Sequence, residues 1–307
     1  MRKIFVFVFI ALGVWTSCSD DKDLGPDIPF VGSYQLPQGK SPADDRIVEL
    51  FHQYGSYFLY EYTQKDFNWT QVSVGGSSTA NYSIETVLGN PVYAVEWLDV
   101  LERIWLKFYP QEFLSKNLPY RILMADTIKQ VWTYVRPTTY FQVYLTTNTL
   151  AIAGLNEDIV SMPGSVEKSF KNVLQQKFLE HLINSGVLVA PDEFYNVSDY
   201  STTATAGEDA RTRGFLPSID SEEKYGIKSE VWVTYIPYGS VELPRTEDFR
   251  HYLMNMISHA ESETSSWATY LTYPLVKKKH DILKKYFFEK YGIEFQKIGD
   301  ANAQYSE

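Results

Sequence analysis

The chain has 307 residues, a formal net charge of −10 at pH 7 and a single cysteine. An acidic chain is repelled by phosphate backbones, so nucleic acid is not an expected partner. One cysteine cannot form an intrachain disulfide or a thiolate metal site. Any chemistry therefore depends on carboxylates and the five histidines, while an aromatic content of 16% supplies core residues and, as an alternative, platforms for ligands.

The first residues predict a signal peptide. Arg2 and Lys3 give a positive start, and Ile4 to Trp15 form an apolar run that is too short to span a membrane. Thr16-Ser17-Cys18 resembles a bacterial lipobox, and the acidic run after Cys18 resembles the surface-export signal of lipoproteins in some Gram-negative bacteria. This resemblance implies cleavage before Cys18, lipidation there and an outer-membrane protein that faces the cell surface. The alternative is an ordinary secretory signal with a chance cysteine.

We expect three segments: a signal peptide at 1–17, a flexible tether at 18–40 and one domain at 41–307. The tether is predicted because residues 19–40 are polar, rich in Gly, Pro and Asp, and show no periodicity. No second apolar stretch reaches spanning length, so contact with the outer membrane is expected through the lipid on Cys18 alone.

The predicted elements follow in chain order. Ser41 and Pro42 begin a helix whose apolar residues, Ile47, Phe51, Tyr54 and Phe58, recur at helical spacing. Lys65 to Val74 predicts a strand, and the apolar stripe from Ala94 to Phe108 predicts a second helix. Four short runs then predict a small, mostly antiparallel sheet: Tyr120 to Met124, Gln130 to Val135, Tyr140 to Leu145 and Leu150 to Ala153.

The second half of the chain is mainly helical by its pattern. Ser165 is expected to cap a helix that ends at Gly186. A turn-rich connection with one strand at Val231 to Ile236 leads to two closing helices, which begin at Thr246 and near Tyr273. The second of these should end at Gly292. The order of helices, strands and helices predicts the α+β class.

An ordered series of short motifs carries a family resemblance. Its members are Val95 to Tyr109, Phe113 to Lys116, Pro119 to Met124, Gly214 to Leu216, Glu247 to Phe249 and the Lys-rich helix before Gly292. Together they resemble the zinc-binding metallopeptidase family of surface lipoproteins, also called substrate import-associated zinc metallohydrolase lipoproteins. The resemblance implies a zincin-like fold. It also implies partners in a TonB-dependent importer and its substrate-binding lipoprotein, with a glycan or peptide as ligand.

That family carries His-His-Glu-Phe-x-His on the helix that here follows Ser165. Two histidines four residues apart hold zinc, and the glutamate acts as general base on the zinc-bound water. Aligned on Phe178, this chain has Gln176 at the first ligand, Lys177 at the base and Glu180 at the second ligand. Glutamine is a poor zinc ligand and a lysine cation repels the metal. Zinc hydrolysis at this helix is therefore not expected.

A reworked metal site is the alternative. The resemblance places the third family ligand at Glu247, and His251 follows it by one turn, on a face opposite the apolar stripe. Glu180, Glu247 and His251 could then surround a metal such as zinc, with Gln176 in support. The competing interpretation makes Glu247 a helix-dipole residue in a first turn and His251 a solvent-facing histidine. His181 falls on the apolar face of its helix and is expected in the core.

The remaining candidates have simpler interpretations. Lys277 to Lys279 predict a solvated helix face, and His52, His259 and His280 are expected to have surface or packing roles. Two dense aromatic clusters, Tyr54 to Tyr62 and Trp132 to Tyr144, could bind a glycan or peptide. The leading hypothesis is a surface lipoprotein with a degenerate metallopeptidase-like domain that serves as a binding or accessory component of nutrient import and needs no cofactor. The competing hypothesis is a metal-dependent hydrolase.

Overall fold

The computed structural model describes residues 34–67, 82–202, 208–217, 219–222, 227–229, 242–262 and 266–305. Residues 36–307 form one unit, and residues 1–35 another. In the larger unit the chain begins with α1 (Asp44–Tyr54), β1 (Tyr57–Leu59), α2 (Gln64–Phe67) and β2 (Tyr82–Leu88). Next come the 3-10 helix η1 (Pro91–Tyr93), α3 (Ala94–Ile104), η2 (Leu106–Phe108) and α4 (Gln111–Asn117).

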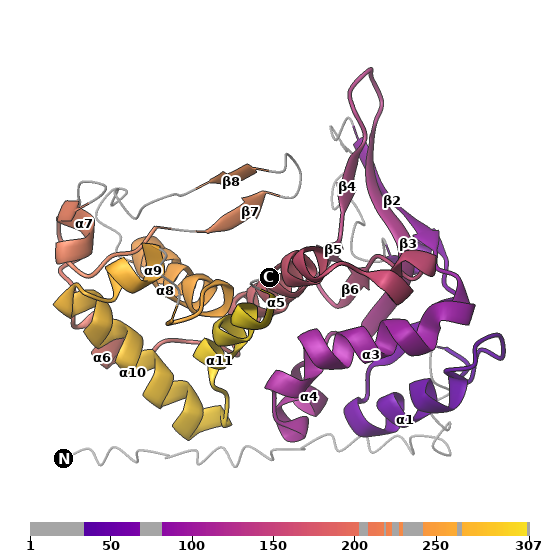
Figure 1. Ribbon diagram of the computed structural model, residues 1–307, viewed down its shortest axis with the longest axis horizontal. Helices are drawn as coiled ribbons and strands as arrows, with labels where there is room; N and C mark the ends of the chain where they lie inside the picture. Colours follow the sequence, from indigo (N-terminus) through magenta and orange to yellow (C-terminus); the bar gives the residue numbers. More distant parts are fainter. Residues whose placement is uncertain are drawn as a thin grey trace, which may run out of the picture. The chain divides into compact units, whose positions relative to one another are not determined.

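The sheet is built around β3 (Arg121–Trp132), a single strand that covers two of the predicted runs. Six strands of the described chain form it, and the other three are β4 (Thr139–Phe141), β5 (Val143–Leu145) and β6 (Thr149–Ile152). β1 and β6 pair with the first part of β3 in parallel, whereas β2 and β4 pair with its outer part in antiparallel fashion. β5 closes one edge, antiparallel to β6. In Figure 1 the outer part of β3 extends away from the helices together with β2 and β4.

The inner part of the sheet packs on helices. Ile122 pairs with Leu150, and Met124 pairs with Ile152, so all four side chains lie on one face. They belong to the same buried cluster as Trp97 of α3 and Phe178 of the later helix α5. The Trp97 indole also donates a hydrogen bond to the carbonyl of Ala153, 3.3 Å away, which ties α3 to the end of β6.

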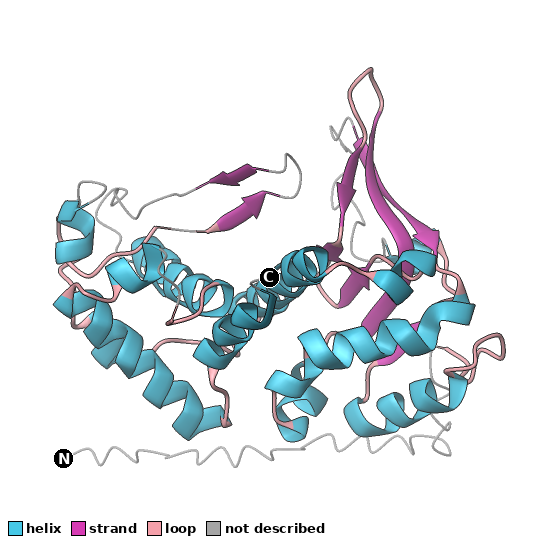
Figure 2. Cartoon of the chain, viewed as in Figure 1, coloured by secondary structure: helices cyan, strands magenta, loops and turns pink. Residues whose placement is uncertain are grey.

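Helix α5 (Gly164–Asn184) follows the short 3-10 helix η3 (Glu157–Ser161). Its buried residues cover more than one face of the helix, which contacts both β5 and α8. The rest of the chain comprises α6 (Asp192–Tyr195), α7 (Glu208–Thr212), the hairpin β7 (Asp220–Glu222) with β8 (Ile227–Ser229), α8 (Glu242–Ser258), α9 (Ser266–Tyr270), α10 (Pro274–Tyr291), α11 (Phe295–Asp300) and η4 (Ala301–Tyr305). Figure 2 shows that the described chain from α8 onward consists of helices joined by loops.

Several predictions are confirmed. The protein combines helices with a sheet in which antiparallel pairings are more numerous than parallel ones, as the α+β class requires. The predicted helices at Ala94, Ser165 and Tyr273 exist. Gly186 and Gly292 follow two of them with φ of +73° and +68°, a backbone conformation that glycine adopts without steric cost.

Other predictions were wrong in detail. Phe58 belongs to β1 rather than to the first helix, and Lys65 to Phe67 are helical rather than extended. Ser165 makes no N-cap hydrogen bond, and Thr246 lies inside α8, which begins at Glu242. The predicted strand at Val231 to Ile236, the rest of the predicted strand to Val74, and Cys18 lie outside the described residues.

The folded unit also starts earlier than the predicted boundary at Ser41. The side chain of Gln38 donates to the carbonyl of Glu61 at 2.7 Å and accepts from the backbone of Tyr60 at 3.0 Å. Gln38, which was assigned to the tether, therefore contacts the two residues that follow β1. Within the described residues, no helix is both long and apolar enough to cross a bilayer.

Candidate functional site

The degenerate motif lies in the middle of α5, where two adjacent glutamines have different environments. Gln175 is fully buried, accepts a hydrogen bond from the Tyr109 hydroxyl at 2.6 Å and donates one to the carbonyl of Ile104 at 2.8 Å. Gln176 is half-buried, and its amide donates to the hydroxyl of Ser258 on α8 at 3.0 Å. Both side chains thus serve helix packing.

The next two motif positions pair with each other. The Lys177 ammonium lies 3.0 Å from the Glu180 carboxylate, one turn further along α5, and both side chains are about one third exposed, at 39% and 32%. The position of the family's general base therefore holds a cation that is paired with the position of the second zinc ligand. These residues do not suit zinc, because the ammonium group would repel a divalent ion at this carboxylate.

Glu247 and His251 lie together on α8, as predicted, but not in the predicted environment. The Glu247 carboxylate is 4.0 Å from Nε2 of His251. His251 is buried, with a side chain that is 4% exposed, and its Nδ1 donates to the carbonyl of Leu216 at 2.8 Å. The interpretation of His251 as a solvent-facing histidine was wrong, because α8 packs on the Leu216 segment at this face. Glu247 is not in a first turn either, since α8 begins at Glu242.

The structure does not bring Glu180 to this pair. Gln176 contacts Ser258, which lies three turns after Glu247, or about 16 Å along the helix axis. Glu180 is one turn from Gln176, so roughly 10 Å still separates it from Glu247 even if the two helices are antiparallel. Zinc ligands lie at about 2 Å from the ion. Across the described residues, no three His, Cys, Asp or Glu side chains are grouped so that they could hold a metal.

A second set of ionisable residues, which the sequence offered no reason to group together, lies between α8 and α10. The Lys279 ammonium is 2.6 Å from the Asp248 carboxylate, and both side chains are fully buried. The Tyr200 hydroxyl donates to the same carboxylate oxygen. Burial lowers the pKa of Lys279, and the charge of Asp248 opposes this shift. The prediction of a solvated face therefore fails at Lys279, although Lys277 and Lys278 are exposed.

Aromatic rings surround this ion pair. The Lys279 ammonium lies 4.8 to 5.5 Å from four ring centroids, those of Phe194, Tyr200, Phe215 and Tyr252. Ring faces attract a cation electrostatically, which offsets part of its lost hydration. The sequence contained one signal of this site: Val276, Leu283 and Phe287 form the buried stripe of α10, and Lys279 is one turn from Val276 on that stripe.

Three of the motifs that carry the family resemblance meet at this aromatic cage. Phe215 supplies a ring, Asp248 supplies the carboxylate, and Lys279 comes from the Lys-rich helix. Tyr252 donates to the carbonyl of Gly214, which has φ of +83° and has no room for a side chain, because a Cβ there would lie 2.8 Å from Oγ of Ser198. These motifs hold the fold together, and the Lys279 and Asp248 side chains between them are fully buried in the described structure.

The other histidines are placed as follows. His52 is exposed and His259 half-buried. His280 is buried against Trp267 and hydrogen-bonds to Gln296 at 3.2 Å. His181 is half-buried beside Phe178, on the edge of the core rather than within it, and partial burial lowers its pKa.

The aromatic clusters divide between core and surface. Tyr57, Phe58 and Tyr60 are buried, so most of the first cluster is core. In the second cluster, the ring of Trp132 lies 5.5 Å from that of Tyr134, and the Arg136 guanidinium lies 4.8 Å from the Trp132 ring. Tyr140, with 61% of its surface exposed, borders a groove beside α5.

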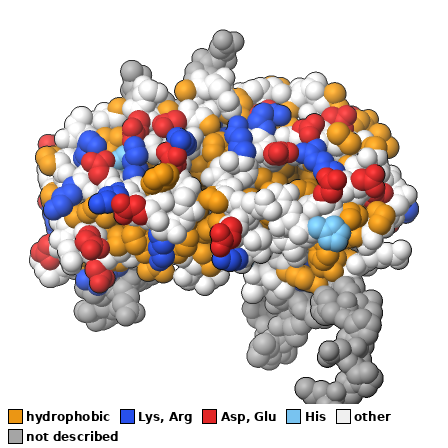
Figure 3. Space-filling model, turned by 90° about the horizontal axis from the view of Figure 1, so that it is seen from below, with side chains coloured by type: hydrophobic (Ala, Val, Ile, Leu, Met, Phe, Trp, Pro, Cys, Tyr) orange, Lys and Arg blue, Asp and Glu red, His pale blue; other side chains and the backbone are white. Residues whose placement is uncertain are grey.

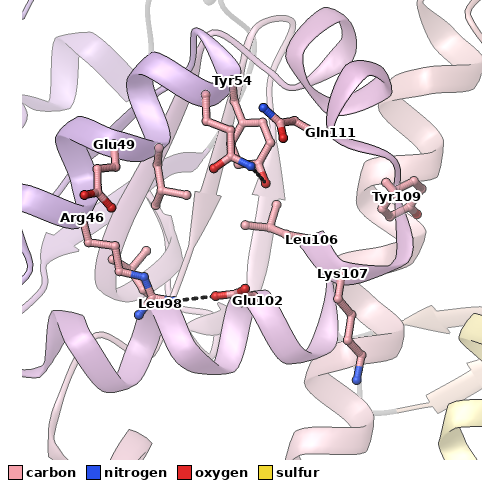
Figure 4. Close-up of a pocket in the computed structure, with 11 residues that line it drawn as sticks. Arg46, Glu49, Tyr54, Leu98, Glu102, Leu106, Lys107, Tyr109 and Gln111 are labelled. Carbon is pink, nitrogen blue, oxygen red and sulfur yellow. Dashed lines mark hydrogen bonds and ion pairs between the residues drawn. The ribbon is translucent and has the colours of Figure 1, made fainter.

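A pocket of about 320 Å³ lies between α1, α3 and α4 (Figure 4). Its floor includes Leu98 and Leu106, and its wall contains Arg46, which is paired with Glu102 at 2.7 Å and also with Asp99. The charge of Arg46 is therefore already neutralised by two carboxylates. Over the face seen in Figure 3, acidic and basic side chains are likewise interspersed, without a broad basic area.

Comparisons with known proteins add little. No protein-family model matches the chain, and no curated protein matches its sequence. Among solved structures, the crystal structure of a "putative zinc-binding metallo-peptidase from Bacteroides caccae ATCC 43185" is similar over 85% of this chain and 90% of that one, with 12% identity and a TM-score of 0.43. So distant a likeness supports no conclusion about chemistry, and the zincin-like fold stays a prediction.

Proposed function

We propose that this protein is a surface lipoprotein whose metallopeptidase-like domain binds a ligand and does not hydrolyse it. The observation that carries the proposal is the Lys177 to Glu180 pair on α5. A zinc hydrolase needs a proton acceptor beside the metal and free donor atoms on one helix face. Here the acceptor position is a paired ammonium, and the adjacent amide of Gln176 is bonded to Ser258.

The proposed setting is an outer-membrane nutrient-import system, in which the domain would stand beside a TonB-dependent importer and its substrate-binding lipoprotein. This setting rests on the motif resemblance and on the lipobox-like residues around Cys18. The first test is fractionation of cells that express the full chain. We expect the native protein in the outer-membrane fraction and a Cys18→Ala variant outside it. Equal outer-membrane recovery of both proteins would contradict the anchor.

The second test addresses the chemistry. We expect mature, tag-free protein to hold far less than one equivalent of zinc after dialysis and to leave a peptide library uncut, as followed by mass spectrometry. One equivalent of zinc that is lost in a Glu247→Ala, His251→Ala double variant would instead establish the reworked hydrolase. Because His251 is buried, circular dichroism must show that this variant is folded.

A gain-of-function variant tests whether the residue types alone account for the missing site. Gln176→His with Glu180→His places two imidazoles one turn apart on α5, the spacing that holds zinc on a helix. We expect this double variant to gain zinc affinity by calorimetry. The matched single variant, Gln176→His, should not. If neither gains affinity, then this face of α5 is closed to metal for a reason other than its residue types.

A further inference from the structure

A groove of about 310 Å³ lies beside the first turns of α5, apart from the degenerate motif. Residues of β3, of β4 and its link to β5, of η3 and of α5 line it. We call it the Tyr140 groove, after the exposed ring at its border. Its volume is near the lower limit, about 300 Å³, of pockets that hold small ligands.

The base of the Tyr140 groove is apolar. Ile159 and Phe170 are buried, and Met162 and Phe141 are partly buried. Two apolar side chains at its border are unusually exposed, Tyr140 at 61% and Val166 at 42%. Both side chains line the same groove, and exposed apolar surface gathered at one place commonly marks an interaction site. The base therefore suits the apolar stem of a side chain.

The charged groups of the groove are all hydrogen-bond acceptors. Among the described residues that line it, the charged ones are Asp126 and Asp158, and none is Lys, Arg or His. Asp126 accepts hydrogen bonds from Asn156 and Thr127, which leaves it further acceptor capacity. Oε1 of Gln142 is buried and has no hydrogen-bond partner in the described structure. Such an unpaired buried acceptor is uncommon in folded proteins.

We propose that the Tyr140 groove binds a basic side chain, arginine or lysine, of a peptide ligand. The apolar stem packs on Phe170 and Met162, and the cationic head meets Asp126, Asp158 and the free oxygen of Gln142. A guanidinium carries five donors and no acceptor, which complements this set of acceptors. The Tyr140 ring adds a face that attracts a cation. This inference deepens the proposed binding function and rests on it.

Calorimetry with a matched peptide pair tests the proposal. Acetyl-Leu-Arg-Leu-amide is compared with the same peptide carrying citrulline, a neutral isostere of arginine, on the full mature chain in EDTA. We expect the citrulline peptide to bind at least about tenfold more weakly, a difference of about 1.4 kcal/mol. Equal affinity, or no binding of the arginine peptide at millimolar concentration, would overturn the proposal.

Variants locate the site. Gln142→Glu adds a negative charge and should tighten binding of the arginine peptide severalfold, whereas Asp158→Asn should weaken it severalfold. Glu157→Gln is the matched control, since Glu157 is the exposed neighbour of Asp158 and does not line the groove. The affinity of this variant for the arginine peptide should stay within about twofold of the native value. If Glu157→Gln weakens binding as much as Asp158→Asn, then net charge rather than the groove is responsible.

Two further arms separate the alternatives. Agmatine, the free guanidinium amine, should bind more weakly than the peptide, and equal affinity would overturn the peptide assignment in favour of small amines. Cleavage of the arginine peptide by metal-loaded protein would refute the proposed non-hydrolytic function. It would leave intact the binding measured in EDTA, so the two proposals fail independently.

Discussion

Two of the pairs that lysines form with carboxylates in the described residues have opposite surroundings. Lys177 and Glu180 lie one turn apart on α5, at 3.0 Å, with about a third of each side chain exposed. Lys279 and Asp248 come from different helices, lie 2.6 Å apart and are fully buried. Water screens the first pair and stabilises each ion separately, whereas the second pair depends on its partner and on the surrounding rings. We therefore expect the motif position to tolerate change and the buried pair not to.

The largest expected effect is at Lys279. Lys279→Met should lower the free energy of unfolding by about 3–5 kcal/mol, because Asp248 would be left buried without its cationic partner. Urea denaturation followed by circular dichroism measures the loss. The control is Lys278→Met on the same helix, where the exposed side chain should matter by less than about 0.5 kcal/mol. Adding Asp248→Asn to Lys279→Met should restore much of the stability, and failure to do so would mean that packing rather than charge explains the loss.

Gln175 and Gln176 extend the comparison between buried and exposed positions to uncharged side chains. Gln175→Ala should cost about 1–3 kcal/mol, since it leaves the Tyr109 hydroxyl and the Ile104 carbonyl buried without partners. Gln176→Ala should cost less than about 1 kcal/mol, because the Gln176 side chain is only partly buried. Denaturation of both variants gives the difference. Equal losses of stability in the two variants would show that the burial of Gln175 does not add to its contribution.

The Arg103 to Glu167 pair is intermediate in exposure, at 45% and 11%, and tests the role of charge through pH. Hydrogen bonds from Arg103 hold the pKa of Glu167 below its usual value, with a smaller contribution from Tyr305. A carboxyl group with a lowered pKa stabilises the fold above its unfolded pKa, about 4.3, and this contribution is lost as pH falls through the folded pKa. Glu167→Gln should therefore cost about 1 kcal/mol at pH 7 and almost nothing well below pH 4. A pH-independent cost would contradict the charge-based account.

The smallest effect is expected at the exposed pair. Lys177→Ala should change the free energy of unfolding by less than about 1 kcal/mol, as for other exposed ion pairs. Thermal melts of this variant and of Glu180→Ala would measure it. A larger loss of stability than that of Glu167→Gln would contradict the comparison, because it would show that the degenerate motif stabilises the fold.

The local sequence pattern was enough to predict part of this structure. Helical periodicity and the glycines at 186 and 292 predicted where two long helices lie and end, because the left-handed backbone conformation that often follows a helix favours glycine. The residue types at Gln176, Lys177 and Glu180 already indicated a motif unsuited to zinc. The signal peptide, the lipid on Cys18 and the import partners are also sequence inferences, and they stay predictions.

Tertiary structure decided what periodicity could not. The parallel pairing of β1 and β6 with β3 joins segments far apart in the chain, and the local pattern of each strand is the same whichever partner it has. Glu247 looked like a ligand by motif, but the contact of Gln176 with Ser258 places it too far along α8. Lys279 looked solvated because it follows two exposed lysines. Its burial depends on Asp248 and four rings from other segments, and only the folded chain brings those together.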